Sequence, residues 1–337
     1  MTSVSKEVVS SLFSGSGLQR SVLSRYRLPD GATCRFLTGG LNDTYVIESP
    51  STKLYLRLYR CDWRRKQDIA AEVDMLVHLA QDGQPVSRPV ARRDGSYLTR
   101  IRAPEGTRWA VVFTDAPGAP PRLNAARAAA YGEVVAGLHV SADRVQQDPR
   151  RFCLDLRHLI EEPIASIEPF LKHRADDLRY LTSIGSDLSE AIESMLPKSR
   201  PEFGFCHGDH HGGNVHQGPD GGLVVFDFDC YGYGWRAYDL AVMLWQLAHS
   251  HGWSRSGRAK VVRRWNGFLE GYNRVRSLGH EELAAIRLFV PVRQIWWLGL
   301  HTHMRLQEVW GGTLGDAFFD ANLGYLREAC DECGIGN

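Results

Sequence analysis

The 337-residue sequence lacks the features that define several large protein classes. No stretch approaches the roughly 18 consecutive apolar residues of a membrane span, and the Ser-rich N-terminal segment has no apolar core of a signal peptide. The net charge of +1 gives no reason to expect nucleic acid or an anionic membrane as a partner. We therefore expect a cytoplasmic protein with neither kind of partner.

Two nucleotide-binding signatures and a disulfide framework are missing as well. Neither G-x-x-x-x-G-K-[ST] nor G-x-G-x-x-G occurs, which removes the main signs of P-loop and dinucleotide-binding folds. The seven cysteines are an odd number scattered along the chain, a pattern that favours reduced thiols. Cys330 and Cys333 form a C-x-x-C, but no second pair stands nearby to complete a zinc site.

One segment carries an unusual set of oxygen-bearing side chains. The run from Phe205 to Asn214 contains Asp209, and Asp227 follows within Phe-Asp-Phe-Asp. Between Asn214 and Asp227 the sequence predicts a strand, a Gly- and Pro-rich turn and a second strand. Residues equidistant from the turn of an antiparallel hairpin face each other. We therefore expect Asn214 and Asp227 to lie side by side at the open end of this ribbon.

An amide oxygen and a carboxylate placed side by side form a site for a hard divalent cation. Magnesium suits this site because it takes few protein ligands and completes its octahedron with phosphate oxygens and water. Asp209 could then accept a proton from an attacking hydroxyl or orient that hydroxyl. The pattern thus predicts Asp209 as the catalytic residue, Asn214 and Asp227 as metal ligands, and phosphoryl transfer from a metal-bound nucleotide.

The segment His207-Gly208-Asp209-x-x-x-x-Asn214, followed by Asp227, resembles the catalytic core of the aminoglycoside phosphotransferase and choline kinase group. The resemblance implies the same three roles. It also implies an α+β, bilobal protein-kinase-like fold with a small sheet-rich N-terminal lobe and a larger, mainly helical C-terminal lobe. Asp239 matches the buried aspartate that braces the catalytic loop in this family, although it is also a typical helix N-cap before an apolar run.

The chain is long enough for two lobes, and its hydrophobic fraction of 43% is ample for a core. We expect residues 1–116 to form the nucleotide-binding lobe and residues 117–337 to form the catalytic and acceptor-binding lobe. The boundary lies in a Pro- and Gly-rich stretch that is too broken for regular structure. The candidate strands of the first lobe are 32–36, 45–48, 54–59, 97–101 and 109–113.

Three turn residues, Gly39, Gly40 and Asn42, lie between the first two candidate strands. Backbone amides in such a turn could approach phosphates closely, although a glycine pair in this place is also typical of a plain hairpin. By resemblance, the stretch from Phe113 to Asp115 forms the hinge whose backbone would hydrogen-bond the purine. Side chains there consequently do not decide between ATP and GTP.

Arg57 alternates with leucines in the third candidate strand, so it points away from the core face. The resemblance places it where the family commonly has a lysine that contacts the nucleotide phosphates, with Lys53 as an alternative. Arginine keeps the charge, but its planar fork is longer and is not equivalent to an ammonium group. Glu72, beside the apolar stripe of the expected helix over 64–82, is the partner that the family implies for Arg57.

Four histidines near the catalytic segment favour an alternative, a zinc-dependent hydrolase, because imidazoles are common zinc ligands. Against this alternative, the sequence has no H-E-x-x-H helix, and zinc would leave Asn214 and Asp227 without a role. The four are His207, His210, His211 and His216.

The sequence does not identify the molecule that accepts the phosphate. Acidic pairs that could hold a polycationic antibiotic are offset by basic residues in the C-terminal part. The run 293–303 is rich in aromatic and imidazole side chains and could wall the acceptor site, or its tryptophans could pack the helix onto the core.

The sequence predicts a Mg²⁺-dependent kinase that transfers the γ-phosphate of ATP (or GTP) to a hydroxyl of a small molecule, an antibiotic or a metabolite. One alternative is a Ser/Thr kinase that acts on a peptide or protein, like bacterial stress-response kinases, and another is a homoserine-kinase-like enzyme. A third alternative is a catalytically silent nucleotide-binding module.

Overall fold

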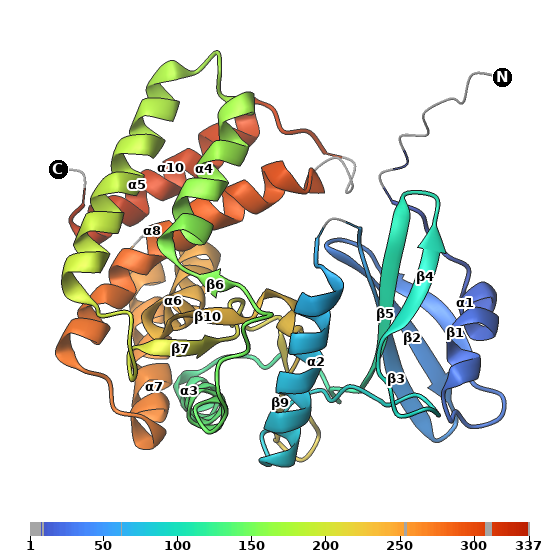
Figure 1. The fold of residues 1–337 in the computed structure, drawn as a ribbon. Coiled ribbons are helices and arrows are strands. Elements are labelled where there is room, and N and C mark those ends of the chain that lie inside the picture. The colour runs from blue at the N-terminus through green and yellow to red at the C-terminus, as the bar shows by residue number, and fades with distance from the viewer. Residues whose placement is uncertain (1–7, 9, 62, 253–254, 307–311, 336–337) are drawn as a thin grey trace, which may run out of the picture. The chain divides into compact units, whose positions relative to one another are not determined.

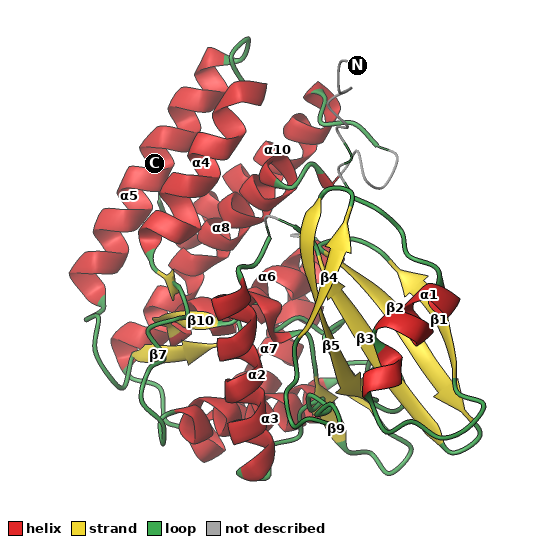
Figure 2. Ribbon diagram, turned by 45° about the vertical axis from the view of Figure 1, so that its right-hand side comes forward, coloured by secondary structure: helices red, strands yellow, loops and turns green. Residues whose placement is uncertain are grey.

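The computed structural model describes residues 8, 10–61, 63–252, 255–306 and 312–335. The chain divides into two compact units (Figure 1). Met1–Gln81 and Val86–Ala116 form the first unit, and Asp82–Pro85 and Pro117–Asn337 form the second. Strands dominate the first unit and helices the second (Figure 2).

The first unit is built around a five-stranded sheet in the order β1-β2-β3-β5-β4, with every neighbouring pair antiparallel. The five strands that the sequence predicts are all present, with ends shifted by a few residues. Their bounds are β1 Thr33–Thr38, β2 Asn42–Ser49, β3 Thr52–Tyr59, β4 Thr99–Ala103 and β5 Gly106–Thr114.

The two faces of this sheet carry different side chains because successive residues of a strand point to opposite sides. Leu56 and Leu58 of β3 are fully buried in an apolar cluster with residues of α1 (Gly15–Ser21) and the short helix η1 (Leu23–Arg25). Arg57, between these two leucines, therefore faces the other side of the sheet. There α2 (Lys66–Gln81) supplies its ion-pair partner.

The second unit consists mainly of helices. Two small sheets interrupt them: three strands in the order β6-β10-β7, and the hairpin β8-β9. The longer elements are α3 Ala125–Ala142, α5 Ala175–Met195, α6 Arg236–His251, α7 Arg255–Val275, α8 His280–His303 and α10 Asp316–Cys333. The shorter ones are β6 Cys153–Leu154, η2 Arg157–Glu161, α4 Glu162–Ile167, η3 Glu168–Phe170, β7 Phe203–Cys206, β8 Val215–Gln217, β9 Leu223–Val225, η4 Phe228–Cys230 and β10 Gly232–Trp235.

Glycines let α3 and α7 approach each other closely. A Cβ atom added to Gly132 of α3 would lie 2.0 Å from the carbonyl oxygen of Phe268, and one added to Gly271 of α7 would lie 1.8 Å from that of Ala129. Neither position accepts a side chain without moving a helix backbone. The close contact matters for the site because α3 supplies one of the residues that hold the catalytic loop.

Helix α8 packs against α4, α5, α6 and α10. Of the helices in the described part of the chain, α8 alone is long and apolar enough by composition to span a membrane: it has 24 residues, and an 18-residue apolar window within it has a mean hydropathy of 1.3. The expectation that no stretch approaches such a composition is wrong for this segment. Since 72% of its apolar window is buried inside the protein, its composition is also that of a core helix.

Candidate active site

The catalytic loop leaves β7 through His207 and Gly208. Gly208 has φ +78°, in the left-handed region that glycine adopts without strain. A Cβ atom there would also lie 2.3 Å from the carbonyl oxygen of Cys230. Both conditions require glycine at this position, which fixes the direction in which the chain enters Asp209.

The side chain of Asp239 holds the start of the catalytic loop through two hydrogen bonds. Its Oδ2 accepts a hydrogen bond from the backbone N–H of His207 at 2.9 Å, and its Oδ1 accepts one from that of Gly208 at 2.7 Å. The aspartate lies in the first turn of α6, where the helix dipole favours a negative charge. The bracing position that the resemblance implies for Asp239 is confirmed by these two bonds.

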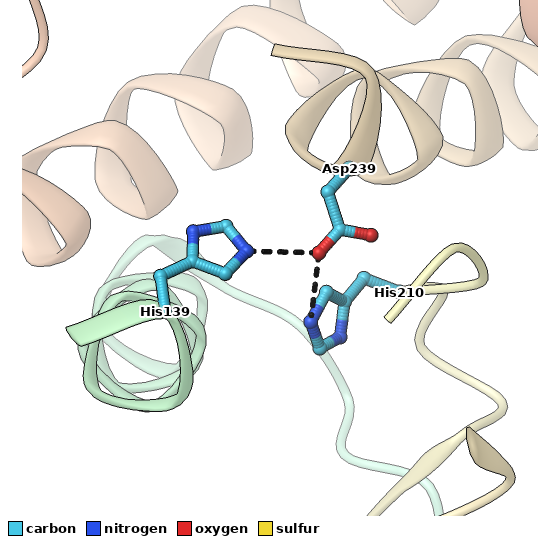
Figure 3. A group of neighbouring side chains, drawn as sticks. All are labelled: His139, His210 and Asp239. Carbon is cyan, nitrogen blue, oxygen red and sulfur yellow. Dashed lines mark hydrogen bonds and ion pairs between the residues drawn. The ribbon is translucent and has the colours of Figure 1, made fainter. Parts of the chain in front are cut away.

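Two buried histidines flank the same carboxylate (Figure 3). Nε2 of His139, on α3, lies 2.9 Å from Asp239 Oδ2, and Nε2 of His210, on the loop, lies 3.4 Å from it. The hydroxyl of Tyr272 lies 2.8 Å from His139 Nδ1, so both nitrogens of this ring have partners. Burial lowers the pKa of His139 to about 4, which keeps the imidazole neutral with its proton on Nε2, facing the carboxylate.

His139, His210 and Asp239 bring three potential metal-ligand atoms within 4.8 Å of one another. Their hydrogen bonds argue against an ion here, because both nitrogens of His139 and both oxygens of Asp239 already have partners. His207 is also engaged: its Nε2 lies 3.0 Å from the carbonyl oxygen of Phe226, and its Nδ1 accepts the Asp209 N–H. These imidazoles hold the loop, and the geometry does not favour the zinc alternative.

Asp209 lies at the tip of this loop with 20% of its side chain exposed. Its Oδ1 pairs with Arg293 of α8. Its Oδ2 accepts a hydrogen bond from Asn214 Nδ2 at 3.0 Å and lies 3.4 Å from Nε2 of His211. Burial by itself raises the pKa of Asp209, but the charges of His211 and Arg293 outweigh it and lower the pKa, so the carboxylate is ionised.

The hairpin register differs by one residue from the prediction. Val215 pairs with Val225, and the Phe226 N–H donates to the carbonyl oxygen of Asn214 at 3.0 Å. Asn214 is therefore opposite Phe226, and the expectation that it directly faces Asp227 is wrong. The turn runs from Gly218 to Gly222, and the Gly218 N–H donates to the carbonyl oxygen of Gly222. The centre of the turn is therefore a single residue, Asp220, and this shifts the partner of Asn214 by one position.

Asp227 follows this pair with φ 67° and ψ 60°, a left-handed conformation that is uncommon outside glycine but accessible to aspartate. The unusual backbone turns the chain out of the strand direction at this point. The negative charge of Asp227 acts on His211, the same imidazole that pairs with Asp209. Asp227 therefore lies within electrostatic reach of the group formed by Asp209 and Asn214.

The oxygen atoms at this site suit a divalent cation. Asn214 donates its amide N–H to both the backbone oxygen and Oδ2 of Asp209, at 3.0 Å each. Within the described ranges no hydrogen bond reaches Asn214 Oδ1, which leaves this oxygen available to an ion. Amide and carboxylate oxygens, such as those of Asn214 and Asp227, are donors that magnesium prefers over the nitrogen and sulfur ligands typical of zinc, and metal binding by these two residues stays a prediction.

In the first unit the predicted ion pair is present. Arg57 Nη1 lies 2.8 Å from Glu72 Oε1, with the glutamate fully buried and the arginine side chain 12% exposed. Tyr59 donates its hydroxyl to Glu72 Oε2 at 2.9 Å, and the Arg57 guanidinium lies 4.9 Å from the ring centre of Phe113. The arginine is thus held by a buried carboxylate on one side and an aromatic face on the other.

The other predicted nucleotide-site residues lie in the strands of the same sheet or directly next to their ends. Gly39 and Gly40 lie in the connection from β1 to β2, and the Gly40 carbonyl oxygen accepts a hydrogen bond from Arg60 at 3.4 Å. Asn42 is the first residue of β2. Phe113 stands opposite Tyr55 near the end of β5, and Asp115 follows it, 3.8 Å from Lys53. Binding of a nucleotide by these residues stays a prediction.

Sequence reasoning missed several residues that support the second-unit site. His139 and Arg293 lie on helices that are distant in sequence from the catalytic segment, and no local motif identifies them as site residues. Arg151 is a third case: it donates to the carbonyl oxygens of Asp229 and Tyr231 at 2.5 Å each, which fixes the segment after Asp227. The sequence marks the run 293–303 as aromatic, but nothing in it indicates a role for its first residue, Arg293.

Comparisons with known proteins agree with this geometry. A family model described as "Phosphotransferase enzyme family" matches residues 33–278. An uncharacterized protein from Deinococcus radiodurans is 37% identical over 292 residues, which cover 87% of this chain and 83% of that protein. The homoserine kinase of Bradyrhizobium diazoefficiens is 26% identical over 299 residues, covering 82% and 84% of the two chains.

Among solved structures, the amicoumacin kinase hAmiN in complex with AMP-PNP, Ca²⁺ and Ami matches with a TM-score of 0.75 at 23% identity. The match covers 94% of this chain and 92% of that one. At this identity the likeness shows the fold, and the predicted α+β, protein-kinase-like fold is confirmed. The predicted enzyme class is confirmed by the family match, and the chain belongs to the phosphotransferase enzyme family.

Proposed function

We propose that this chain is a kinase that uses Mg²⁺ and transfers the γ-phosphate of ATP or GTP to a hydroxyl group of a small molecule. The observation that carries the proposal is the group formed by Asp209 and Asn214, with Asp227 in electrostatic reach, on a loop held rigidly by Asp239. Phosphoryl transfer depends mostly on positioning and charge neutralisation, and a rigid, charged loop supplies both.

In this proposal Asp209 accepts a hydrogen bond from the acceptor hydroxyl and orients its oxygen toward the phosphorus. Because the carboxylate is ionised, it can also take the hydroxyl proton as the hydroxyl oxygen bonds to the γ-phosphorus and the bond from that phosphorus to the β,γ-bridging oxygen breaks, which releases the nucleoside diphosphate. A divalent cation held by Asn214 and Asp227 would neutralise charge on the nucleotide phosphates. Asn214 also donates a hydrogen bond to Asp209. The residue that would hold the ion therefore also fixes the position of the catalytic carboxylate relative to that ion.

We assign nucleotide binding to the first unit and catalysis with acceptor binding to the second. Arg57 is the phosphate-contacting cation, and its ion pair with the buried Glu72 limits where the guanidinium can point. The connection containing Gly39, Gly40 and Asn42 would cover the phosphates. The backbone from Phe113 to Asp115 would contact the base.

A small-molecule acceptor is favoured by the similarity to the amicoumacin kinase, whose solved complex contains a nucleotide analogue and Ca²⁺. The similarity to a homoserine kinase, over 82% of this chain, supports a second candidate, a small amino acid with a side-chain hydroxyl. A Ser or Thr side chain of a peptide offers the same chemical group in a larger molecule.

The test is a transfer screen with labelled ATP and Mg²⁺ against hydroxylated metabolites, antibiotics, homoserine and peptides. Phosphate on a small molecule, in a reaction that Asp209→Asn suppresses, supports the proposal. Label on homoserine alone selects the second candidate, and label on a peptide or protein alone selects the protein-kinase alternative. Nucleotide binding without transfer to any acceptor would reject the kinase proposal in favour of a silent binding module.

A further inference from the structure

Arg293 makes polar contacts with two consecutive residues of the catalytic loop. The residue lies in the middle of α8, and its side chain is only 3% exposed. Nη1 donates to the carbonyl oxygen of Gly208 at 3.0 Å and to the hydroxyl of Tyr238 at 3.2 Å. Nη2 pairs with Oδ1 of Asp209. One guanidinium therefore connects the backbone of the loop with the carboxylate at its tip.

Aromatic rings fix the orientation of this guanidinium. Its central carbon lies 4.4 Å from the ring centre of Trp296 and 5.4 Å from that of Trp245. Trp245 is held in turn, because its indole N–H donates to Gln294 at 2.8 Å. A planar cation over the faces of aromatic rings gains cation–π attraction and loses freedom to rotate. The tryptophans thus pack α8 onto the core and seat the arginine at the same time.

The two oxygens of Asp209 have different surroundings. Oδ1 faces the buried, permanently charged Arg293. Oδ2 faces Asn214 and His211, and the His211 side chain is 29% exposed, so this oxygen is on the accessible side of the carboxylate. An arginine that occupies one oxygen leaves the other as the atom that can meet an incoming hydroxyl.

We propose that Arg293 is a positioning residue for the transfer reaction, which fixes the Asp209 carboxylate so that Oδ2 receives the acceptor hydroxyl. The inference rests on the proposed function. Asp209 is the group that would touch the acceptor, and Arg293 acts through it. Without the arginine, the Oδ1 side of the carboxylate loses its tie to the backbone of Gly208, only the contacts on the Oδ2 side are left, and the carboxylate can rotate away from the reacting position.

The test compares Arg293→Ala with Arg293→Lys and a control, Arg174→Ala. Arg174 is also largely buried, with 15% of its side chain exposed, and it pairs with Asp177 and Asp320, away from the catalytic loop. Misplacement of a reacting group by about 1 Å costs on the order of 100-fold in rate, so we expect this loss of kcat in Arg293→Ala. The KM for the nucleotide should stay within about threefold, because the contacts of Arg293 described above are made with residues of the second unit, whereas nucleotide binding is assigned to the first.

Rescue separates positioning from general support of the fold. About 20 mM guanidinium, far below denaturing concentrations, should restore kcat of Arg293→Ala by at least about tenfold, because the ion can occupy the place that the arginine side chain vacates beside Trp245 and Trp296. The same addition should leave Arg174→Ala unchanged. Arg293→Lys keeps the charge but cannot reach Gly208 and Asp209 together, so we expect an intermediate kcat.

Several results would overturn the inference. Wild-type kcat in Arg293→Ala would show that the carboxylate does not need the arginine. A loss that guanidinium does not restore, or a parallel loss of nucleotide affinity, would assign Arg293 a merely structural role. If Arg293→Ala does not fold, wild-type kcat in Arg293→Lys rejects the inference and an intermediate value supports it. A wild-type protein that transfers phosphate to no acceptor rejects the proposed function itself, and the inference with it.

Discussion

Replacing Asp239 with alanine removes the acceptor on which the catalytic loop rests. The carboxylate accepts hydrogen bonds from the backbone N–H groups of His207 and Gly208 and from Nε2 of His139, and it is fully buried. In the variant these donors have no protein acceptor in the same place. The change should therefore affect both stability and the geometry of Asp209.

The expected loss of stability follows from counting donors. A buried donor left without its partner costs about 1–3 kcal/mol, and three donors are affected. Water that enters the new space can satisfy part of them, and neighbouring effects are not additive. We therefore expect the free energy of unfolding to fall by about 3–6 kcal/mol, a large part of the roughly 5–15 kcal/mol that stabilises a typical protein. Asp239→Asn retains one acceptor oxygen and should lose about half as much.

Urea unfolding followed by far-UV circular dichroism measures this loss, with phosphate transfer measured on the same samples. Asp187→Ala is the matched control, because Asp187 is an exposed aspartate on α5 of the same unit. The control should stay within about 0.5 kcal/mol of the wild type. A loss below about 1 kcal/mol in Asp239→Ala, combined with unchanged transfer, would refute the bracing role.

Three further predictions concern pH, the catalytic group and the first unit. Because burial lowers the pKa of His139 from 6.5 to about 4, only the unfolded chain takes up this proton as the pH falls through that range. The free energy of unfolding should thus decrease by up to about 3 kcal/mol between pH 6.5 and pH 4, and urea midpoints of wild type and His139→Gln should converge as the pH falls. Asp227→Ala should abolish turnover and Asp209→Asn should lower kcat by about 100-fold or more; full activity of either variant in a nucleotide-consumption assay would reject the assigned roles. Glu72→Gln should raise the Kd for AMP-PNP about tenfold in calorimetry, because Arg57 loses its buried ion partner, and an unchanged Kd would remove Arg57 as a phosphate ligand.

Local patterns predicted the elements and several pairings well. Alternation of leucines in β3 placed Arg57 opposite the core face, and the apolar stripe of α2 identified the neighbouring Glu72 as the residue that matches the partner implied by the family resemblance. These inferences succeed because a side chain's face is fixed by the period of its own strand or helix. The catalytic segment was equally readable, since its chemistry lies in a short stretch of sequence.

Two features of the site could not be predicted from local sequence patterns: the hairpin register and the long-range partners of the catalytic loop. The hairpin register depends on the hydrogen bonds inside the turn, and assuming a symmetrical turn placed Asn214 opposite Asp227 instead of Phe226. Arg293 contacts the loop and His139 contacts Asp239, which holds the loop, through tertiary packing of α8 and α3, and no spacing in the sequence encodes those contacts. Long-range partners of a recognised motif therefore needed the structure.

In the proposed function, Asn214 and Asp227 hold the cation of a bound nucleotide. The decisive experiment is calorimetry of AMP-PNP binding, which gives the Kd with Mg²⁺ and with EDTA in the wild type and in Asp227→Ala. We expect Mg²⁺ to tighten AMP-PNP binding at least about tenfold in the wild type and to leave the affinity of the variant unchanged. An equal effect of Mg²⁺ on both proteins, or none on the wild type, would contradict this expectation.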